Sequence, residues 1–191
     1  MRVRFAILLA KLTSLLIKIL GLGAGATWPG EIALTLAPNV LTSFVPRLTK
    51  GVILVAGTNG KTTTSLMIKT ILEKQGYSVV HNASGANLLN GVVSACIQQA
   101  SWDGKLNADY GVFEIDENSL PIVLKECHSD PRAGIQVNTK TGSRVPPFRR
   151  ARKPGMTTLT VVLLNLFRDQ LDRYGEVDVI AEKWERALRE Q

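Results

Sequence analysis

Residues 51–65, GVILVAGTNGKTTTS, constrain the fold more than any other part of the chain. Their VILV run is short, apolar and mostly β-branched, which is typical of a strand buried on both faces. The turn Gly57–Gly60 can then reverse the chain tightly, and Thr62 opens a helix that we expect to reach Leu72 and to end at Gly76. A strand, a glycine turn and a helix in this order predict one βα unit of a parallel sheet.

The turn resembles a phosphate-binding loop, whose common pattern is G-x-x-x-x-G-K-[ST]. Gly60, Lys61 and Thr62 match the end of that pattern, but Val55 stands where its first glycine belongs. Free N–H groups and a helix N-terminus would hold a polyphosphate, with Lys61 at the β- and γ-phosphates and the Thr62 hydroxyl on Mg²⁺. The alternative is an ordinary βα turn with an incidental Gly-Lys-Thr. The predicted nucleotide-binding residues of the loop are Gly57, Thr58, Asn59, Gly60, Lys61, Thr62 and Thr63.

Length and composition limit what can surround this unit. A chain of 191 residues has room for one domain with a small appendage. Its hydrophobic fraction of 45% and charged fraction of 20% are those of an ordinary globular protein. Its two cysteines, Cys96 and Cys127, allow neither a disulfide framework nor a four-cysteine zinc site, so zinc is not expected in this chain. We expect both to be buried thiols in a reducing cytoplasm.

The net charge of +7 invites a nucleic-acid interpretation, but the charge is concentrated in one segment. Residues 128–156 hold seven lysines and arginines against one aspartate, which leaves only +1 for the rest of the chain. Four prolines and little periodicity predict a solvated, partly disordered loop there. Binding of RNA or of anionic lipid is the alternative for this loop, and for the chain as a whole we expect no nucleic-acid partner.

The N-terminal segment RVRFAILLAKLTSLLIKILGLGAGA imitates a signal peptide, with basic residues, an apolar run and small residues at its end. However, Arg4, Lys11 and Lys18 recur at a spacing of seven with Ser14 between them, which makes one polar stripe on a helix. A membrane span needs about 20 mostly apolar residues without such a stripe. We therefore expect an amphipathic helix packed on the domain of a cytoplasmic protein. Contact with the inner face of the membrane stays open, because a basic helix with an apolar face suits it.

Beyond the loop, strand-like runs and helical patterns alternate. The candidate strands are 77–80, 110–115 and 159–164, and the candidate helices are 91–100, 119–127 and 176–190. This alternation predicts an α/β fold with a mostly parallel sheet flanked by helices on both faces. Ligands of such sheets bind at the carboxyl ends of the strands.

Polar residues gather at those predicted strand ends. Glu114 and Asp116 close the YGVFEI strand, and Asn165 and Asp169 follow the LTVVLL strand. Carboxylates beside a phosphate loop suit Mg²⁺, a hard cation that prefers oxygen ligands. For Asp169 a charge pair at a helix start explains the residue equally well, whereas Glu114 emerges from an apolar strand and is harder to explain structurally.

The loop G-T-N-G-K-T-T is similar to that of the Mur ligase family, G-T-x-G-K-T-[ST], whose glycine stands at the place of Gly57 rather than Val55. The resemblance implies a P-loop NTPase-like central domain. It also implies enzymes that use ATP to convert a carboxylate into an acyl phosphate, which an amine then attacks. Folylpolyglutamate synthases share this chemistry.

Four further stretches resemble the MurT-type subunits of lipid II isoglutaminyl synthase. They are GLGAGATWPGEIAL (21–34), HNASGANLLNG (81–91), GVFEIDENSLP (111–121) and NLFRDQLDRYGEVD (165–178). Such subunits work with a GatD-type glutamine amidotransferase and amidate the D-glutamate of the lipid II stem peptide to D-isoglutamine. The resemblance implies catalytic roles for Lys61 and Glu114 and places Thr62 and Glu114 at Mg²⁺. It also places the loop containing Ser84 and Asn87 near the active site.

Three departures from the family pattern narrow these expectations. Gln170 stands where most Mur ligases have a metal-associated histidine, although MurT-type chains resemble this one there. Lys183 is near, but not at, the place of the carbamylated lysine of other Mur ligases, so that role is not assigned. The zinc ribbon, the rest of the central domain and the C-terminal domain have no counterpart, and residues 128–156 interrupt a short family connection. A fragment, a misassembled reading frame and a divergent chain would each explain this.

Taken together, the sequence predicts an N-terminal amphipathic helix and lead-in over residues 1–48. Residues 49–191 are then part of a Mur ligase-type ATP-binding domain, interrupted by the basic loop 128–156. The predicted function is the ATP-binding portion of a MurT-like ligase in peptidoglycan synthesis. The alternatives are a folylpolyglutamate synthase-like or other Mur-type amide ligase, and a nucleotide-binding remnant without catalysis.

Overall fold

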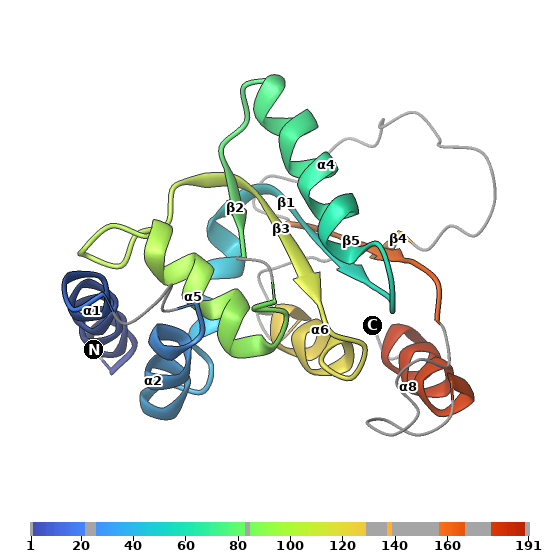
Figure 1. Cartoon of the computed structure of the whole chain (residues 1–191), viewed down its shortest axis with the longest axis horizontal. Coiled ribbons are helices and arrows are strands. Elements are labelled where there is room, and N and C mark those ends of the chain that lie inside the picture. The colour runs from blue at the N-terminus through green and yellow to red at the C-terminus, as the bar shows by residue number, and fades with distance from the viewer. Residues whose placement is uncertain are drawn as a thin grey trace.

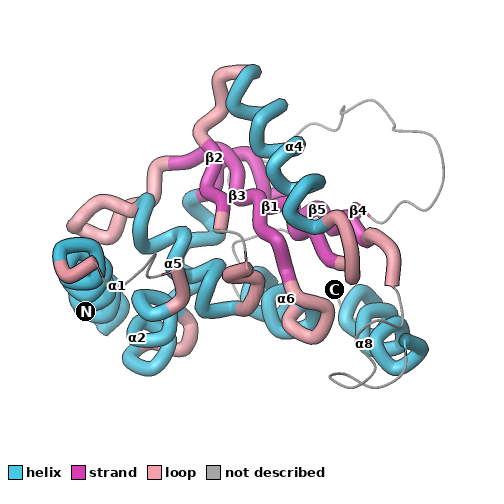
Figure 2. The backbone as a smooth tube through the Cα atoms, viewed as in Figure 1, coloured by secondary structure: helices cyan, strands magenta, loops and turns pink. Residues whose placement is uncertain are grey.

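The structure is a computed structural model that describes residues 2–21, 26–82, 85–128, 137–138, 157–166 and 177–189. Its centre is a five-stranded sheet in the order β2-β3-β1-β5-β4, and each neighbouring pair of strands is parallel. Figure 1 follows the chain through this sheet, and Figure 2 shows the strands side by side between the helices. The strands are β1 Leu48–Ala56, β2 Val79–His81, β3 Ala108–Ile115, β4 Val137–Asn138 and β5 Thr158–Leu163. The predicted α/β fold with a mostly parallel sheet is confirmed.

Helices cover the sheet from both sides. The helices are α1 Arg2–Ile19, α2 Trp28–Leu36, α3 Val40–Phe44, α4 Lys61–Lys74, α5 Leu89–Gln99, α6 Leu120–His128 and α8 Val177–Arg189, with the 3₁₀ turn η1 at Val45–Arg47. Helix α4 lies on one side of the sheet, and α5 and α6 lie on the other (Figure 1). One continuous hydrophobic core joins side chains of α1, α2, α5 and α6 with the central strands and reaches α8 through Trp184.

The predicted elements are all present, with ends that differ by a few residues. The largest difference is at β1, which begins at Leu48 rather than Val52, because Leu48 is fully buried and pairs with Ala108 of β3. Helices α2 and α3 were not predicted and lie in the lead-in, where Phe44 is fully buried. Cys96 and Cys127 are buried free thiols, as expected, and burial raises the pKa of Cys127 to about 12.

The basic segment 128–156 is only partly described. Helix α6 extends into it as far as His128, and Val137–Asn138 form the short edge strand β4 beside β5. The prediction of a continuous loop therefore missed a two-residue strand. A strand this short has no detectable periodicity of its own, and only its pairing partner defines it. The remainder of the segment lies outside the described residues.

Helix α1 is present, but its packed face is not the one that the polar stripe indicated. It packs against α2 and α5 through Ala6, Ile7, Ala10 and Ser14, so Ser14 is buried rather than part of a solvated stripe. Small side chains allow two helices to approach closely, and this contact outweighs the exposure of larger apolar residues elsewhere on α1. Among the described helices, none has the length and apolar character needed to cross a membrane.

Gly30 sits where α2 crosses α5 at very short range. Its N–H donates to the Ser94 hydroxyl at 2.8 Å, and a Cβ at this position would lie 1.8 Å from the carbonyl oxygen of Asn90. Because the obstacle is backbone, the helices themselves would have to separate. Gly30→Ala is expected to lower the free energy of unfolding by about 1–3 kcal/mol, measured by denaturant titration.

The matched control on the same helix is Thr35→Ala. Thr35 is exposed, and its hydroxyl donates only to the carbonyl of Glu31 one turn earlier. Its removal is expected to change stability by less than about 0.5 kcal/mol. Equal stability of Gly30→Ala and the control would contradict the close approach of α2 and α5.

Candidate nucleotide-binding site

The site lies where the direction of chain connection reverses in the sheet. After β1 the chain passes through α4 to β2 on one side, whereas after β3 it passes through α6 to β4 and β5 on the other. The carboxyl ends of β1 and β3 are held level, since Val55 is paired with Glu114. In open parallel sheets this switch point is where a crevice forms and ligands bind.

The loop between β1 and α4 depends on two glycines with positive φ. Gly57 has φ +145° and Gly60 has φ +83°, backbone conformations that residues other than glycine rarely adopt. A Cβ on Gly57 would also lie 2.6 Å from the Cβ of Leu164. The conformation directs the start of α4 at the crevice, and the first N–H groups of that helix have no partners within it.

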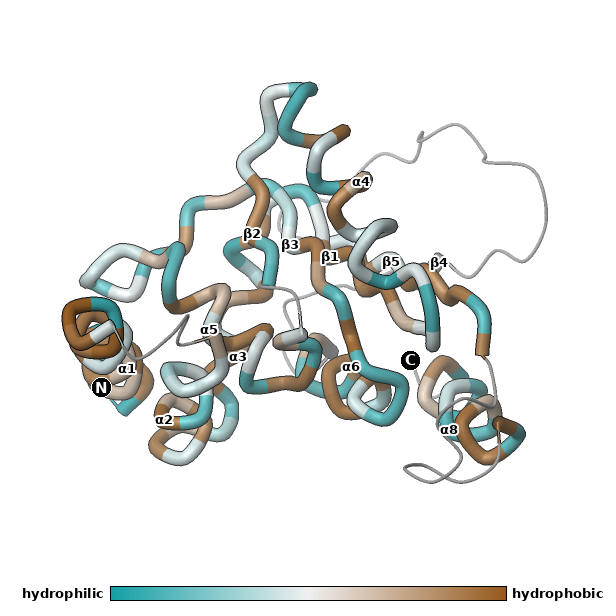
Figure 3. The backbone as a smooth tube through the Cα atoms, in the orientation of Figure 1, coloured by the Kyte–Doolittle hydropathy of each residue, from teal (hydrophilic) through white to brown (hydrophobic). Residues whose placement is uncertain are grey.

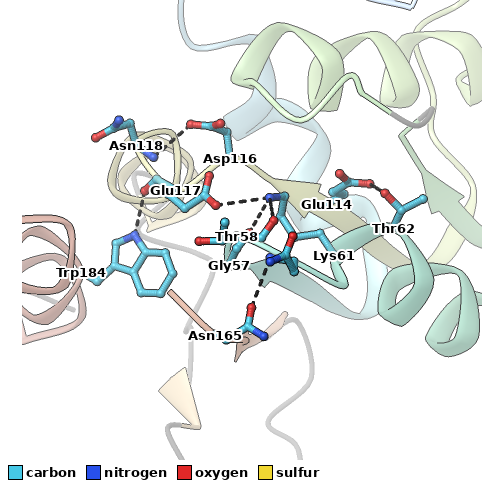
Figure 4. Close-up of polar contacts among 11 residues, drawn as sticks. Gly57, Thr58, Lys61, Thr62, Glu114, Asp116, Glu117, Asn118, Asn165 and Trp184 are labelled. Carbon is cyan, nitrogen blue, oxygen red and sulfur yellow. Dashed lines mark hydrogen bonds and ion pairs between the residues drawn. The ribbon is translucent and has the colours of Figure 1, made fainter. Parts of the chain in front are cut away.

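The segment after β5 supports the loop between β1 and α4 through hydrogen bonds. The N–H of Thr58 donates to the carbonyl oxygen of Asn165 at 2.8 Å, and the N–H of Asn59 donates to the Asn165 side-chain oxygen at 3.2 Å. Asn165 was predicted to bind the nucleotide. In the structure it contacts the backbone of the glycine loop (Figure 4), where it holds the loop in shape.

Lys61 is folded over the loop and is nearly buried. Its ammonium group donates to the carbonyl oxygens of Gly57 and of Thr58, the latter at 3.1 Å, and forms an ion pair with Glu117 at 3.3 Å. Glu117 is 3% exposed, and its other carboxylate oxygen has no hydrogen-bond partner among the described residues. An incomplete set of partners around a buried carboxylate leaves room for a further cationic or donor group.

Thr62 and Glu114 meet across the crevice. The Thr62 hydroxyl donates to a Glu114 carboxylate oxygen at 2.8 Å, and Glu114 is 4% exposed (Figure 4). The backbone of Glu114 is clamped by Asn82, whose amide accepts from its N–H at 2.9 Å and donates to its carbonyl at 2.8 Å. Asn82 also donates to the carbonyl of Ala86 at 2.6 Å, which ties the next loop to the same point.

These groups border one cavity of about 320 Å³. It is lined by Thr58, Asn59, Gly60, Lys61, Thr62, Thr63, Asn87 and Glu114. Most predicted site residues are thus brought together, including Asn87, whose carbonyl accepts from the N–H of Asp116 at 2.8 Å. The predicted site residues Ser84 and Asp169 lie outside the described residues.

Sequence reasoning missed two residues that contact the cavity lining, Asn82 at Glu114 and Glu117 at Lys61. Asn82 was read only as part of a longer motif, although an amide directly after a strand is a common backbone clamp. Glu117 was overlooked because it follows Asp116 in a turn, where charged residues are usually solvated. It is held by Trp184 of α8, whose indole N–H donates to the Glu117 carbonyl at 2.7 Å. No local pattern relates residues so far apart in the sequence.

His81 is a titratable residue at the end of β2 that contacts α4. Its Nε2 atom lies 3.1 Å from the Ser65 hydroxyl. Burial lowers the pKa of His81, and the nearby Lys69 ammonium lowers it further. The ring is therefore neutral at neutral pH, so it adds no positive charge beside the cavity.

Comparison with known proteins agrees with this geometry. Residues 55–140 match the family described as Mur ligase middle domain. Two curated proteins of Staphylococcus aureus, from strains N315 and COL, are 34% and 33% identical to this chain over 180 residues. Both are named lipid II isoglutaminyl synthase (glutamine-hydrolyzing) subunit MurT. The alignment covers 94% of this chain and 33% of each relative.

A protein of the same name from Streptococcus pneumoniae (strain ATCC BAA-255 / R6) is also similar. It is 31% identical over 156 residues, which are 82% of this chain and 28% of that protein. The chain thus spans about a third of the length of the curated relatives that it matches.

The Asn82 clamp provides a test of how the site is supported. Asn82→Ala would leave the buried N–H and carbonyl of Glu114 without partners, and each such group costs about 1–3 kcal/mol. We therefore expect a loss of about 2–4 kcal/mol in the free energy of unfolding, measured by denaturant titration. The control is Asn107→Ala, which removes an exposed amide and is expected to be nearly neutral. Equal stabilities of the two variants would show that the clamp is not formed.

Proposed function

Because this chain belongs to the Mur ligase family, we propose that it is the ATP-binding portion of a MurT-like amide-forming ligase. The observation that carries the proposal is the 2.8 Å contact of Thr62 with Glu114, beside Lys61 in a cavity that opens at a glycine loop. A hydroxyl, a carboxylate and a lysine at a helix N-terminus are together the groups that a magnesium–nucleotide complex requires. The proposed division into a lead-in over 1–48 and an ATP-binding part over 49–191 follows from the same assignment.

The donor set fits Mg²⁺ bound to a nucleotide. Thr62 and Glu114 supply two hard oxygen ligands at the cavity wall. Among the described residues, no cluster of three or more histidine, cysteine or acidic side chains could hold a metal. Mg²⁺ in phosphate-transfer sites is commonly held by one or two carboxylates together with phosphates and water, so two protein ligands are adequate. Bound there, Mg²⁺ would neutralise charge on the β- and γ-phosphates.

The residues of the chain would then act mainly by position and charge. The N–H groups at the start of α4 would bind the phosphates, and Lys61 would turn from Glu117 toward the γ-phosphate. The proposed reaction transfers the γ-phosphoryl group to a substrate carboxylate, giving ADP and an acyl phosphate. Ammonia then attacks the carbonyl carbon, phosphate leaves and the amide forms. Asn87, beside Glu114 in the cavity lining, is proposed to face the carboxylate substrate.

The names of the relatives suggest the substrate and the partner. We propose that the carboxylate is the D-glutamate of the lipid II stem peptide. A GatD-type glutaminase would supply the ammonia, as expected for a subunit of a glutamine-hydrolysing synthase. A folylpolyglutamate synthase-like ligase is the alternative within the same family, and a remnant that binds ATP without catalysis is the alternative outside enzymes.

Lys61→Ala tests the phosphate loop. Loss of a hydrogen bond to a charged group is worth about 1.5–3 kcal/mol, so the Kd for ATP–magnesium should rise about 10- to 150-fold in calorimetric titration. The matched control is Lys69→Ala on the same helix, which removes a surface ion pair with Glu73 and should leave the Kd unchanged. If the Lys61→Ala variant bound ATP as tightly as the control, the phosphate-loop assignment would be wrong.

A second experiment addresses the reaction. Lipid II is incubated with this chain, a GatD-type partner, glutamine and ATP–magnesium, and mass spectrometry follows the change from carboxyl to amide. We expect ATP binding without appreciable amidation. The described cavity wall provides only loop and strand-end groups, and catalysis of this kind depends on full enclosure of the reactants. Robust amidation by the 191-residue chain would contradict this expectation. Glutamate addition to a folate in a parallel assay would instead favour the folylpolyglutamate synthase alternative.

A further inference from the structure

Helix α1 presents a broad apolar surface to solvent. We call it the outer face of α1, and it consists of Phe5, Leu8, Leu9, Leu12, Leu15, Leu16 and Ile19, with Leu20 directly after the helix. Four of these side chains are more than half exposed: Phe5 at 61%, Leu16 at 56%, Ile19 at 70% and Leu20 at 64%. Figure 3 shows the strongly apolar tube of α1 at the margin of the molecule, away from the sheet. Large apolar surfaces exposed together in this way mark sites of interaction.

The width of the outer face distinguishes between kinds of partner. At 100° per residue the eight side chains span about 140° of the helix circumference. A partner helix in a coiled coil requires a narrower seam, with charges of both signs beside it. A bilayer accepts a wide apolar face, because the whole face enters the boundary between headgroups and acyl chains.

The charges on α1 are all positive. Arg4, Lys11 and Lys18 lie along one edge of the outer face, and the first acidic residue of the chain is Glu31. A helix whose own charges are all positive is complementary to a negatively charged lipid surface.

An exposed tryptophan lies beside this edge. The Lys11 ammonium is 5.4 Å from the centre of the Trp102 ring, and Trp102 is 55% exposed. Tryptophan and lysine side chains are characteristic anchors at the level of lipid headgroups. Trp102 is far from α1 in the sequence, so it is an observation independent of the helix pattern.

We propose that the outer face of α1 binds peripherally to anionic phospholipid bilayers, with Arg4, Lys11 and Lys18 at the headgroups. Binding to lipid does not involve the nucleotide cavity, so it can fail or succeed independently of ATP binding. If the proposed substrate lipid II is correct, this contact would hold the chain at the surface where that substrate lies.

The test is flotation of the whole chain with vesicles of phosphatidylcholine alone or with about 30% phosphatidylglycerol. We expect co-flotation with the anionic vesicles, weakened by added salt. Leu12→Gln with Leu16→Gln on the outer face should lower the partition coefficient about tenfold or more. Arg4→Gln with Lys18→Gln should lower it about fivefold for each charge removed at low salt.

A matched control comes from exposed apolar residues elsewhere. Leu66→Gln with Met67→Gln changes two exposed side chains of α4 and should leave flotation unchanged. Circular dichroism melting of each variant shows that the fold is retained. Failure of the wild-type chain to float with anionic vesicles, or equal flotation of the Leu12 and Leu16 variant, would overturn the proposal. A dimer that the same variant dissociates, with no flotation, would identify a second copy as the occupant instead.

Discussion

Parallel pairing of β1 with both β3 and β5 is the constraint on which the rest of the structure depends. It aligns Ala56 with Ile115 on one side and with Leu163 on the other, so the three strands end at one level. Parallel strands require crossovers, and these send the chain in opposite directions after β1 and after β3. The resulting crevice receives the glycine loop with the start of α4, and also Glu114, which is 52 positions from Thr62 in the sequence.

Backbone hydrogen bonds, rather than side-chain packing alone, hold the crevice in shape. Asn165 fixes the loop from the β5 side, and Asn82 fixes Glu114 from the β2 side. Asn82 uses both the donor and the acceptor of its side-chain amide on the backbone of Glu114, whereas Asn165 accepts from two loop N–H groups through its side-chain and backbone oxygens. The charged side chains are thus held by a hydrogen-bonded frame, and Lys61 lines the cavity while it is paired with Glu117. A site assembled before binding loses little free energy when a ligand arrives.

The lead-in packs on the rest of the molecule at both of its ends. Ala6, Ala10 and Ser14 are small, so α1 approaches α2 closely, and the same geometry leaves its leucines outside. The opposite arrangement would bury more apolar area but would hold the two helices further apart. At the other end, Leu48 and Phe44 join the lead-in to the main core, so the described part of the lead-in and the sheet share one hydrophobic cluster. The surface that remains on α1 is therefore a product of tertiary packing and is the basis of the proposed lipid contact.

The sequence by itself determined the class of the fold, the order of its strands and helices apart from α2, α3 and β4, and the place of the glycine loop. These depend on local signals: the apolar run before Gly57, the glycines that permit positive φ, and Glu114 at the end of an apolar strand. Only the tertiary structure decided which face of α1 is buried, that Asn165 contacts the loop backbone, and that Asn82 and Glu117 contact residues of the cavity lining. The physical reason is that these roles depend on partners far away in the chain. Lys61 and Glu117 are 56 positions apart, and Glu117 and Trp184 are 67 apart. Hydrogen bonds and helix contacts over such separations leave no periodic trace in the sequence, because they are formed only when the sheet brings the segments together.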